Sequence, residues 1–431
     1  MKKFITLSLL TFSLITNLNA NEEKTSEEPT RFESLSKLTK VIGTVEKYYV
    51  DEIKLNEIVN KTLKGLMQEL DAHSSFLDQK SSKEMSIQTK GEFGGLGITV
   101  GMRDAALTVI SPIDDTPAFN AGIKSEDIIL KIDDNATLNM TLDEAVSLMR
   151  GKPGTDITLT VVRKGETKPL NIKITRDIIK IQSVFAQKIQ DEDLLYLRVS
   201  SFDSKVVDGL VDAIKEADWA KGIVLDLRNN PGGLLSQAIG VVDIFVDNGV
   251  IVSQKGRDAA DEEKFEATKA NTLTKLPVVV LVNGGSASAS EIVSGALQDH
   301  KRAVIVGQKT FGKGSVQAVL PINEDRTENI KLTIAKYYLP SGRTIQATGV
   351  TPDIIAYDGK VTKNENDDFK IKEADLKKHL EGELEKIGDK VEKKDDELKD
   401  DKKLVSLEKI ENDNQLNTSI NILKSLIIMN K

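Results

Sequence analysis

Three closely spaced serines, Ser286, Ser288 and Ser290, are the first residues of this chain whose type could do nucleophilic chemistry. They follow a nearly unbroken apolar run of strand length, 277–283, and lead into residues 290–298, where apolar side chains recur at helical spacing. The connection between this strand and this helix must be sharp. Backbone N–H groups at a helix start have no partner within the helix, so they could stabilise an oxyanion beside a serine.

Ser288 also has a purely structural interpretation. Ser288-x-x-Glu291 ahead of an apolar run is the pattern of a capping box, in which the serine only stabilises the start of the helix. The choice between a cap and a nucleophile therefore depends on whether the chain offers a base.

A lysine between two glycines is the candidate base, within Gly312-Lys-Gly-Ser-Val-Gln317. If 313–320 is a strand, its two-residue period places Lys313, Ser315 and Gln317 on one face, where the Gln317 carbonyl could hold the lysine amine. A lysine acts as a base only when it is neutral, so burial must lower its pKa from about 10.4 to roughly 7 or 8. The alternative is an ordinary exposed lysine in a Gly-rich turn.

Together, the runs Ser286-Ala-Ser-Ala-Ser-Glu291 and Thr310-Phe-Gly-Lys-Gly-Ser-Val-Gln317 resemble the carboxyl-terminal processing (tail-specific) protease family, without a gap. The resemblance implies that Ser288 is the nucleophile, that Lys313 is its base and that Gln317 orients the lysine. No metal or organic cofactor is expected for this chemistry.

The same resemblance implies an oxyanion hole made of backbone N–H groups. Residues 226–233, Asp-Leu-Arg-Asn-Asn-Pro-Gly-Gly, follow a buried-looking strand, where α/β sheets usually place ligands. In the family, a glycine of this turn and the residue after the nucleophile are the donors. The matching positions are Gly232 (or Gly233) and Ala289, although the glycines could also serve only a tight turn.

Two other chemistries fit the sequence poorly. Residues 307–313 nearly form a phosphate-binding loop, but Gly314 stands where Ser or Thr should hold magnesium. A Ser-His-Asp triad needs a histidine, and the chain has only His73, His300 and His379. His300 follows the helix that starts at Ser288, roughly 18 Å away at about 1.5 Å per residue, so it cannot be the base of that serine.

Composition limits the remaining classes. The 431 residues have room for two or three domains, and a hydrophobic content of 39% allows a sizeable core. The formal net charge of -8 comes with both signs mixed along the chain, so we expect no nucleic-acid partner. The absence of cysteine excludes disulfides and thiolate metal sites, and three scattered histidines argue against zinc.

Residues 1–20 have the pattern of a secretory signal peptide: two lysines, an apolar run over 4–15, and Leu-Asn-Ala at 18–20 as the cleavage site. The alternative, an uncleaved anchor, would need more than about a dozen apolar residues to span a bilayer. We therefore expect a periplasmic mature protein, in solution or at the inner membrane.

Residues 88–176 are predicted to form short strands with a helix, and they resemble a PDZ domain. The short helix would be 117–123 and the groove helix 141–150. Successive N–H groups of a Gly-rich turn can bind a terminal carboxylate, and an exposed strand edge can accept an extended peptide. The residues implied in peptide binding are Gly95, Leu96, Gly97 and Ile98.

Two positions of this segment need comment. Glu126 stands where the family usually has glycine, so the turn there is expected to differ. Arg150 ends the groove helix, where it either only complements the helix C-terminus or links peptide binding to the protease core.

The whole chain is predicted to be a multidomain α/β and α+β protein. Apolar spacing predicts helices over 32–49 and 58–70, which either cover the core or pair with a second copy to form a homodimer. Strands and helices alternate over 177–357, which favours an α/β core. The predicted parts are a signal peptide (1–20), a helical module (21–87), a PDZ domain (88–176), a protease core (177–357), a charged linker (358–403) and a C-terminal helix (404–431).

These predictions lead to a secreted Ser-Lys endopeptidase that grips the C-terminal tails of unfolded or precursor exported proteins in its PDZ groove. An adaptor protein is a second class of partner to consider. The rival functions are a catalytically silent PDZ scaffold and a chaperone-like quality-control factor. The set Ser288, Lys313 and Gln317 argues against the scaffold, because a pure binder has no reason to bury a lysine amine.

Overall fold

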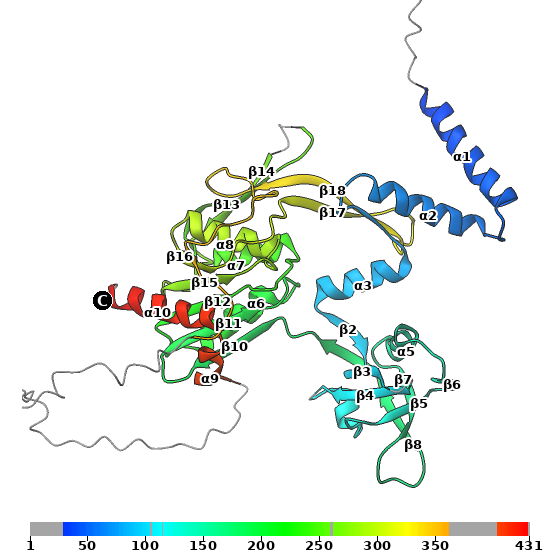
Figure 1. The fold of residues 1–431 in the computed structure, drawn as a ribbon, viewed down its shortest axis with the longest axis horizontal. Coiled ribbons are helices and arrows are strands. Elements are labelled where there is room, and N and C mark those ends of the chain that lie inside the picture. The colour runs from blue at the N-terminus through cyan, green and yellow to red at the C-terminus, as the bar shows by residue number, and fades with distance from the viewer. Residues whose placement is uncertain (1–28, 104–105, 114, 259–261, 362–402, 430–431) are drawn as a thin grey trace, which may run out of the picture. The chain divides into compact units, whose positions relative to one another are not determined.

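The computed structural model describes residues 29–103, 106–113, 115–258, 262–361 and 403–429 (Figure 1). They divide into two compact units, Met1–Leu66 and Met67–Lys431. The predicted signal peptide and residues 362–402 of the predicted linker lie outside the described residues. Within the described ranges, no helix is both long enough and apolar enough to cross a membrane.

The first unit consists of helices at the two places where apolar spacing predicts them, α1 (Arg31–Tyr48) and α2 (Leu55–Gln68), whose last residues reach into the second unit. A capping box starts α1. The Thr30 N–H donates to the Glu33 carboxylate (2.8 Å) and the Glu33 N–H donates to the Thr30 hydroxyl (3.3 Å). No side chain of α1 is buried, and Phe32 and Leu35 are exposed.

The segment after α2 also contains a short strand that the sequence does not predict within the helical module. β1 (Ser75–Leu77) is a strand that pairs antiparallel with β18 (Asn329–Tyr338), and α3 (Gln79–Lys90) follows it. Phe76 and Leu77 of β1 are buried. A run of three residues is too short for its periodicity to be recognised, so the sequence gives no signal for this strand.

The PDZ-like region contains a six-stranded sheet in which β3, β4, β5, β7 and β8 are neighbours in that order and β6 pairs with β5. Two helices accompany it, α4 (Pro117–Asn120) and α5 (Leu142–Met149). A separate pair, β2 (Glu92–Gly95) and β9 (Asp177–Lys180), joins its two ends. The bounds of the sheet strands are Ile98–Arg103 (β3), Ala106–Pro112 (β4), Ile128–Ile132 (β5), Asn135–Ala136 (β6), Asp156–Val162 (β7) and Leu170–Thr175 (β8).

A seven-stranded sheet forms the centre of the α/β core, in the order β19-β16-β15-β12-β11-β10-β20. Neighbouring strands are parallel except β10 and β11. The predicted alternation of strand and helix is present. The bounds are Val184–Ile189 (β10), Leu194–Val199 (β11), Val206–Glu216 (α6), Gly222–Asp226 (β12), Leu235–Asp243 (α7), Val278–Val282 (β15), Ala303–Gly307 (β16), Ile354–Ile355 (β19) and Leu404–Val405 (β20). The nucleophile candidate precedes α8 (Ala289–Asp299).

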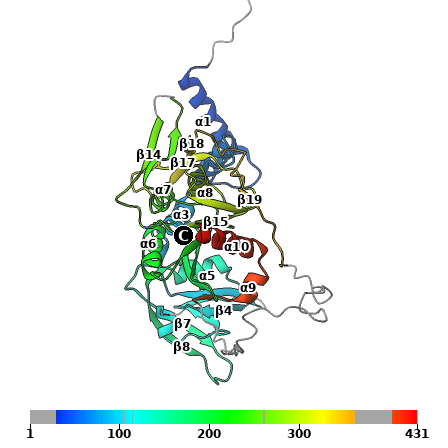
Figure 2. The ribbon, with the colours of Figure 1, turned by 90° about the vertical axis from the view of Figure 1, so that its left-hand side faces the viewer.

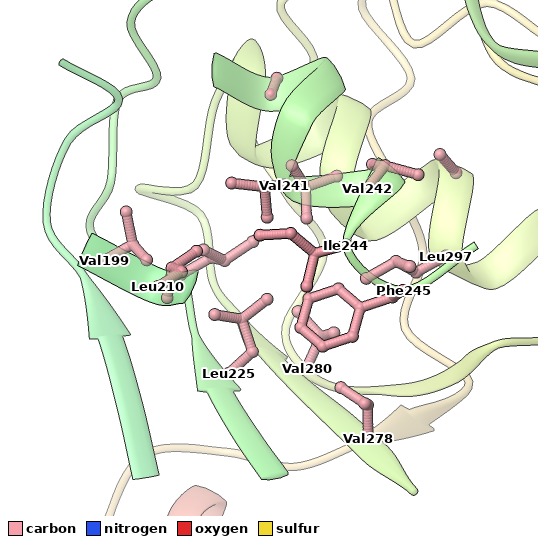
Figure 3. Close-up of a cluster of buried hydrophobic side chains, with 14 of the residues drawn as sticks. Val199, Leu210, Leu225, Val241, Val242, Ile244, Phe245, Val278, Val280 and Leu297 are labelled. Carbon is pink, nitrogen blue, oxygen red and sulfur yellow. The ribbon is translucent and has the colours of Figure 1, made fainter. Parts of the chain in front are cut away.

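Both faces of this sheet are buried, because successive side chains of a strand point to opposite faces. Ile223 and Leu225 of β12 belong to one apolar cluster and Val224, between them, belongs to another. Figure 3 shows part of the first cluster, where Phe245, which follows α7, lies beside Val280 of β15.

The second face of the sheet is covered by residues 403–429, here called the C-terminal segment, which contain β20, α9 (Leu407–Glu411) and α10 (Asn414–Met429). Figures 1 and 2 both show α10 alongside β15. The sequence predicts this helix but not the surface on which it packs. The apolar side chains that make this contact are Leu416, Ile420 and Leu423 of α10 with Val224 and Val279 of the sheet.

A second sheet of the core, with neighbouring strands antiparallel, has the order β1-β18-β13-β14, and β17 pairs with β18. The remaining bounds are Asn248–Lys255 (β13), Glu262–Thr268 (β14) and Ser315–Pro321 (β17). The sequence predicts a strand from residue 313, but β17 begins at Ser315. Lys313 lies in the loop before it, because the N–H groups of Gly312 and Lys313 donate to the Glu291 side chain rather than to a neighbouring strand.

Candidate active site

Two turns at the ends of neighbouring parallel strands meet at the candidate site. The glycine turn (227–233) follows β12, and the nucleophile turn (283–288) follows β15. Asn230 joins them, because its carbonyl accepts hydrogen bonds from the Ala287 N–H (3.0 Å) and from the Ser290 hydroxyl (2.9 Å). The carboxyl ends of parallel strands thus bring together residues that are far apart in sequence.

The three competing serines have different roles in this arrangement. The Ser286 hydroxyl donates to the Leu227 carbonyl (2.8 Å), and the Ser290 hydroxyl donates to the Asn230 carbonyl, so both hold the two turns together. Ser288 has a φ of 54°, a left-handed conformation that is uncommon outside glycine and that stores strain. Of the three, Ser288 is the one whose backbone is bent sharply at the helix start.

Glu291 connects the candidate nucleophile to the candidate base. Its fully buried carboxylate accepts from the N–H groups of Ser288 (2.9 Å), Gly312 (2.7 Å) and Lys313 (2.8 Å), and from the Thr310 hydroxyl (2.5 Å). The sequence assigns Glu291 only to a capping box and misses its contacts with the lysine loop. The available signal was a charged residue in the most apolar part of α8.

Lys313 is half-buried, and its surroundings favour a neutral amine. Burial lowers the pKa of the Lys313 ammonium and the charge of Lys331 lowers it further, while Asp71 and Glu291 oppose this shift. A lower pKa raises the fraction of lysine that can accept a proton at working pH. Nearby, burial and the charge of Lys313 lower the pKa of His73.

The structure modifies the predicted role of Gln317. Its side-chain amide nitrogen donates to the hydroxyls of Ser315 (2.9 Å) and Thr333 (3.2 Å). The carbonyl oxygen of Gln317 and the amine of Lys313 form no hydrogen bond with each other here. Gln317 therefore lies on the same strand face as Ser315, as the two-residue period predicts, with its oxygen still available as an acceptor.

The structure distinguishes the two glycines that the sequence offers as oxyanion donors. Gly232 lies against the nucleophile, since a Cβ there would be 2.9 Å from Ser288 Cβ and 3.0 Å from Ala289 N. However, the Gly232 N–H donates to the Asn230 side chain (2.9 Å). The N–H groups of Gly233 and Ala289 donate to no acceptor in the described part of the chain, so Gly233, the alternative to Gly232, is the glycine whose N–H is available beside Ala289.

In the PDZ-like region, the predicted peptide-binding residues run from Gly95, the last residue of β2, to Ile98, the first residue of β3, which is an edge strand beside α5. Gly97 has a φ of 78°, and a Cβ there would be 2.3 Å from Thr116, so this position requires glycine. Gly95 and Leu96 are buried, whereas Ile98 is half-buried. Glu126, where the sequence departs from the family, adopts the positive φ (69°) that a glycine would take easily.

The remaining predicted site features are not at the dyad. His300 Nε2 is 2.8 Å from the Val250 carbonyl oxygen, and its ring lies beside Gly249, which agrees with its exclusion as the base of Ser288. His379 lies outside the described residues. The Arg150 guanidinium lies over the ring of Phe93 (4.8 Å). Among the residues that the structure describes, no group of His, Asp and Glu side chains could hold a metal ion.

Comparison with known proteins places these features in a family. The sequence model of peptidase family S41 matches residues 193–356, and that of the PDZ domain matches residues 94–174. A carboxy-terminal-processing protease of Bartonella bacilliformis is 44% identical over 389 residues, which cover 89% of this chain and 88% of that protein. The chain belongs to this family of carboxy-terminal processing proteases.

Two further relatives extend the comparison. The carboxy-terminal processing protease CtpA of Bacillus subtilis is 35% identical over 323 residues, which cover 74% of this chain and 68% of that protein. Among solved structures, a photosystem II D1 C-terminal processing protease aligns with a TM-score of 0.42 and 26% identity, over 74% of this chain and 92% of that chain.

This S41 peptidase has a further contact that neither motif predicts. Arg228 of the glycine turn donates to Asp226 (2.7 Å) and makes two hydrogen bonds to the Asp413 carboxylate (2.9 and 2.8 Å). Gln415 accepts from the same guanidinium (3.0 Å) and donates to the Ala356 carbonyl (2.9 Å). Asp413 belongs to the C-terminal segment, which lies beyond residues 193–356, so the glycine turn is held from outside the part that matches the S41 model.

Proposed function

We propose that this chain is a secreted serine endopeptidase in which Ser288 is the nucleophile and Lys313 the general base. The observation that carries the proposal is the single Glu291 carboxylate, which binds the backbone of both residues while Ser286 and Ser290 are occupied in holding the turns. A buried carboxylate with several strong donors is a rigid support, as a preorganised site requires.

In the proposed reaction, Ser288 Oγ attacks the scissile carbonyl as the neutral Lys313 amine takes its proton. The N–H groups of Ala289 and Gly233 donate to the resulting oxyanion. The Lys313 ammonium then protonates the leaving amine, and the C–N bond breaks. Lys313 finally activates a water, which hydrolyses the acyl-enzyme and restores the serine.

The first test replaces the two reacting groups in turn. Ser288→Ala should abolish cleavage of an unfolded protein while lowering stability by no more than the loss of a cap, about 0.5 to 2 kcal/mol. Lys313→Arg should also be inactive, because guanidinium keeps its proton at working pH. Steady-state cleavage and thermal unfolding are the measurements. A Ser288→Ala variant that retained a tenth of the activity, or an active Lys313→Arg variant, would contradict the assignment.

The pH dependence tests the base separately. Because burial lowers the pKa of Lys313, kcat/KM of the original protein should rise with pH through an apparent pKa well below about 10.4. A profile that keeps rising until the ordinary lysine pKa would mean that the amine is not tuned for catalysis.

We also propose that Gly95 to Ile98 bind the terminal carboxylate of the substrate, and that the partners are C-terminal tails of unfolded or precursor exported proteins in the periplasm. The same proposal includes two further partners: a second copy of the chain, bound through the N-terminal helices, and an adaptor protein. The support is the glycine-dependent turn at Gly97 next to an edge strand.

A substrate with an amidated C-terminus tests the tail-binding part. Loss of a charge-assisted interaction should weaken binding by about one to two orders of magnitude. If tail binding also organises the catalytic residues, kcat should fall as KM rises; if the PDZ region is only a tether, KM alone should change. Equal kcat/KM for the free and amidated tails would rule out tail recognition here.

A further inference from the structure

A turn ahead of β1, residues 71–74, contacts the strand face that carries Gln317. The Asp71 carboxylate accepts from the N–H groups of His73 (2.7 Å) and Ser74 (2.9 Å) and from the Ser74 hydroxyl (2.7 Å). The Ser74 hydroxyl in turn accepts from the Thr333 N–H on β18 (3.1 Å). The turn is therefore fixed both within itself and to the strand next to Gln317.

Thr333 provides the link to the catalytic residues. Its hydroxyl lies 3.1 Å from Asp71 Oδ1 and 3.2 Å from the side-chain nitrogen of Gln317. A hydroxyl has one proton to donate and two lone pairs that accept. Several hydrogen bonds hold the pKa of Asp71 at about 2 although burial opposes them, so this carboxylate is ionised at neutral pH and can only accept.

The direction of the hydrogen bonds that join Asp71, Thr333 and Gln317 follows from the ionised state of the Asp71 carboxylate. Because Asp71 can only accept, the Thr333 hydroxyl must donate to it, and the Thr333 oxygen must accept from Gln317. The amide nitrogen of Gln317 therefore faces Thr333, and its second proton goes to the Ser315 hydroxyl (2.9 Å). The amide oxygen is then the atom of this group that remains able to accept a hydrogen bond, as the lysine amine would require.

We propose that Asp71 and Thr333 are positioning residues that set the orientation of the Gln317 amide, so that its oxygen and not its nitrogen is presented to Lys313. This inference rests on the Ser-Lys chemistry proposed above. With the oxygen toward the lysine, an N–H of the amine donates a hydrogen bond to the Gln317 oxygen, and the lone pair of the amine is directed to Ser288. With the nitrogen there instead, the amide would compete with the serine proton for that lone pair.

The charges around Lys313 determine the expected effect on pH dependence. Lys331 of β18 lowers the pKa of Lys313, Asp71 of the turn and Glu291 of α8 raise it, and His73 is close enough to be affected in turn. An amide oxygen beside the amine favours the ammonium form. If the amide is free to turn, this preference is lost and the pKa of Lys313 falls. The acid limb of the kcat/KM profile should then move to lower pH, even as the rate falls.

Thr333→Val is the direct test, because it removes the hydroxyl, keeps the branched shape and leaves the backbone N–H that binds Ser74. We expect kcat to fall about tenfold, KM to change little, and the acid limb to shift to lower pH. Thr333→Ser should restore both the rate and the profile. Thr272→Val is the matched control, since the Thr272 hydroxyl donates to the Val246 carbonyl away from the dyad.

Asp71→Asn provides a second variant. An asparagine can donate to Thr333 as well as accept, so the hydroxyl is free to donate to Gln317 and the amide can reverse; the variant also lacks the charge that raises the Lys313 pKa. It should lower kcat and shift the acid limb in the same direction as Thr333→Val, and thermal unfolding measured in parallel shows whether the turn itself has weakened.

The outcomes separate this inference from the proposed function. Unchanged kcat and pH profile in Thr333→Val, with Ser288→Ala inactive, would overturn the positioning role alone. An equal loss in Thr333→Ser would also overturn it, because packing and not the hydroxyl would then be responsible. An active Ser288→Ala would instead overturn the Ser-Lys chemistry on which both depend.

Discussion

The two halves of the active site are held in different ways. The proposed nucleophile and base are held by Glu291, whose carboxylate accepts hydrogen bonds from the Ser288 N–H at the helix start and from three donors of the lysine loop, Thr310, Gly312 and Lys313. The glycine turn is held by Arg228, whose partner Asp413 is 185 positions away in the sequence. The first support joins the start of α8 to a loop 19 to 22 positions further along the chain, whereas the second requires the C-terminal segment to have packed.

The two supports therefore differ in how much of the chain must be folded before each can form. A contact that closes a short loop costs less chain entropy than one that closes a long loop, and a buried carboxylate with four donors leaves the proposed dyad few alternatives. A contact that closes a long loop depends on the packing of α10, whose apolar side chains share a cluster with Val224 and Val279. We therefore expect changes in the C-terminal segment to disturb the glycine turn, while Ser288 and Lys313 keep their geometry.

The largest effect should come from Glu291→Gln. A neutral amide would direct one or two N–H groups toward backbone donors that now bind a carboxylate, and each buried donor left unpaired costs about 1 to 3 kcal/mol. We expect kcat/KM to fall by about a hundredfold or more, with a lower unfolding temperature.

Glu144→Gln is the matched control for this change, because Glu144 completes a capping box with Thr141 on α5 but is exposed. It should have little effect on either measurement. Similar losses in the two variants would show that Glu291 is only a cap.

A smaller effect is expected for Asp413→Asn. The change keeps the size of the side chain but leaves the Arg228 guanidinium with Asp226 as its only carboxylate partner in the described structure. Cleavage should fall about tenfold, mainly in kcat, because the donor of the glycine turn is needed in the transition state and not for binding.

Glu192→Gln tests whether loosening the C-terminal segment elsewhere has the same effect, since the half-buried Glu192 pairs with the exposed Lys424 of α10. Exposed ion pairs contribute about 0 to 1 kcal/mol, so activity should be nearly unchanged. An equal loss of kcat in both variants would contradict a specific role of Asp413 at the glycine turn.

The smallest effect concerns acid stability. Burial raises the pKa of Asp413, but hydrogen bonds from Arg228 and from the Leu416 N–H outweigh it, so the pKa lies below its ordinary value of 3.8. A depressed carboxyl pKa contributes stability above the unfolded pKa, which is lost as pH falls through the folded one.

The difference in unfolding free energy between the original protein and Asp413→Asn should therefore shrink as pH is lowered below about 4. Denaturant unfolding of both proteins at neutral pH and near pH 3 measures this change. A difference that stays constant across that range would mean that the ionised form of Asp413 does not hold the segment.

The sequence was sufficient for features that depend on local order. Residues 278–282 are a strand because an unbroken apolar run of this length fits a strand buried on both faces, and residues 289–299 are a helix because apolar side chains recur there at helical spacing. The serine between them therefore had to lie in a sharp turn. The sequence also predicted the C-terminal helix, which the structure contains as α10. It missed β1, which has only three residues, and it began β17 two positions too early.

Only the tertiary structure decided which polar groups meet. Asn230 occupies the N–H of Gly232 and leaves that of Gly233 available, Glu291 binds the lysine loop, and Arg228 binds Asp413. The physical reason is that periodicity fixes which face of an element a side chain occupies, whereas its hydrogen-bond partner depends on which distant element packs there. The sequence of this peptidase therefore determined the chemistry it carries, and the packing of its turns, β18 and C-terminal segment decided how that chemistry is held in place.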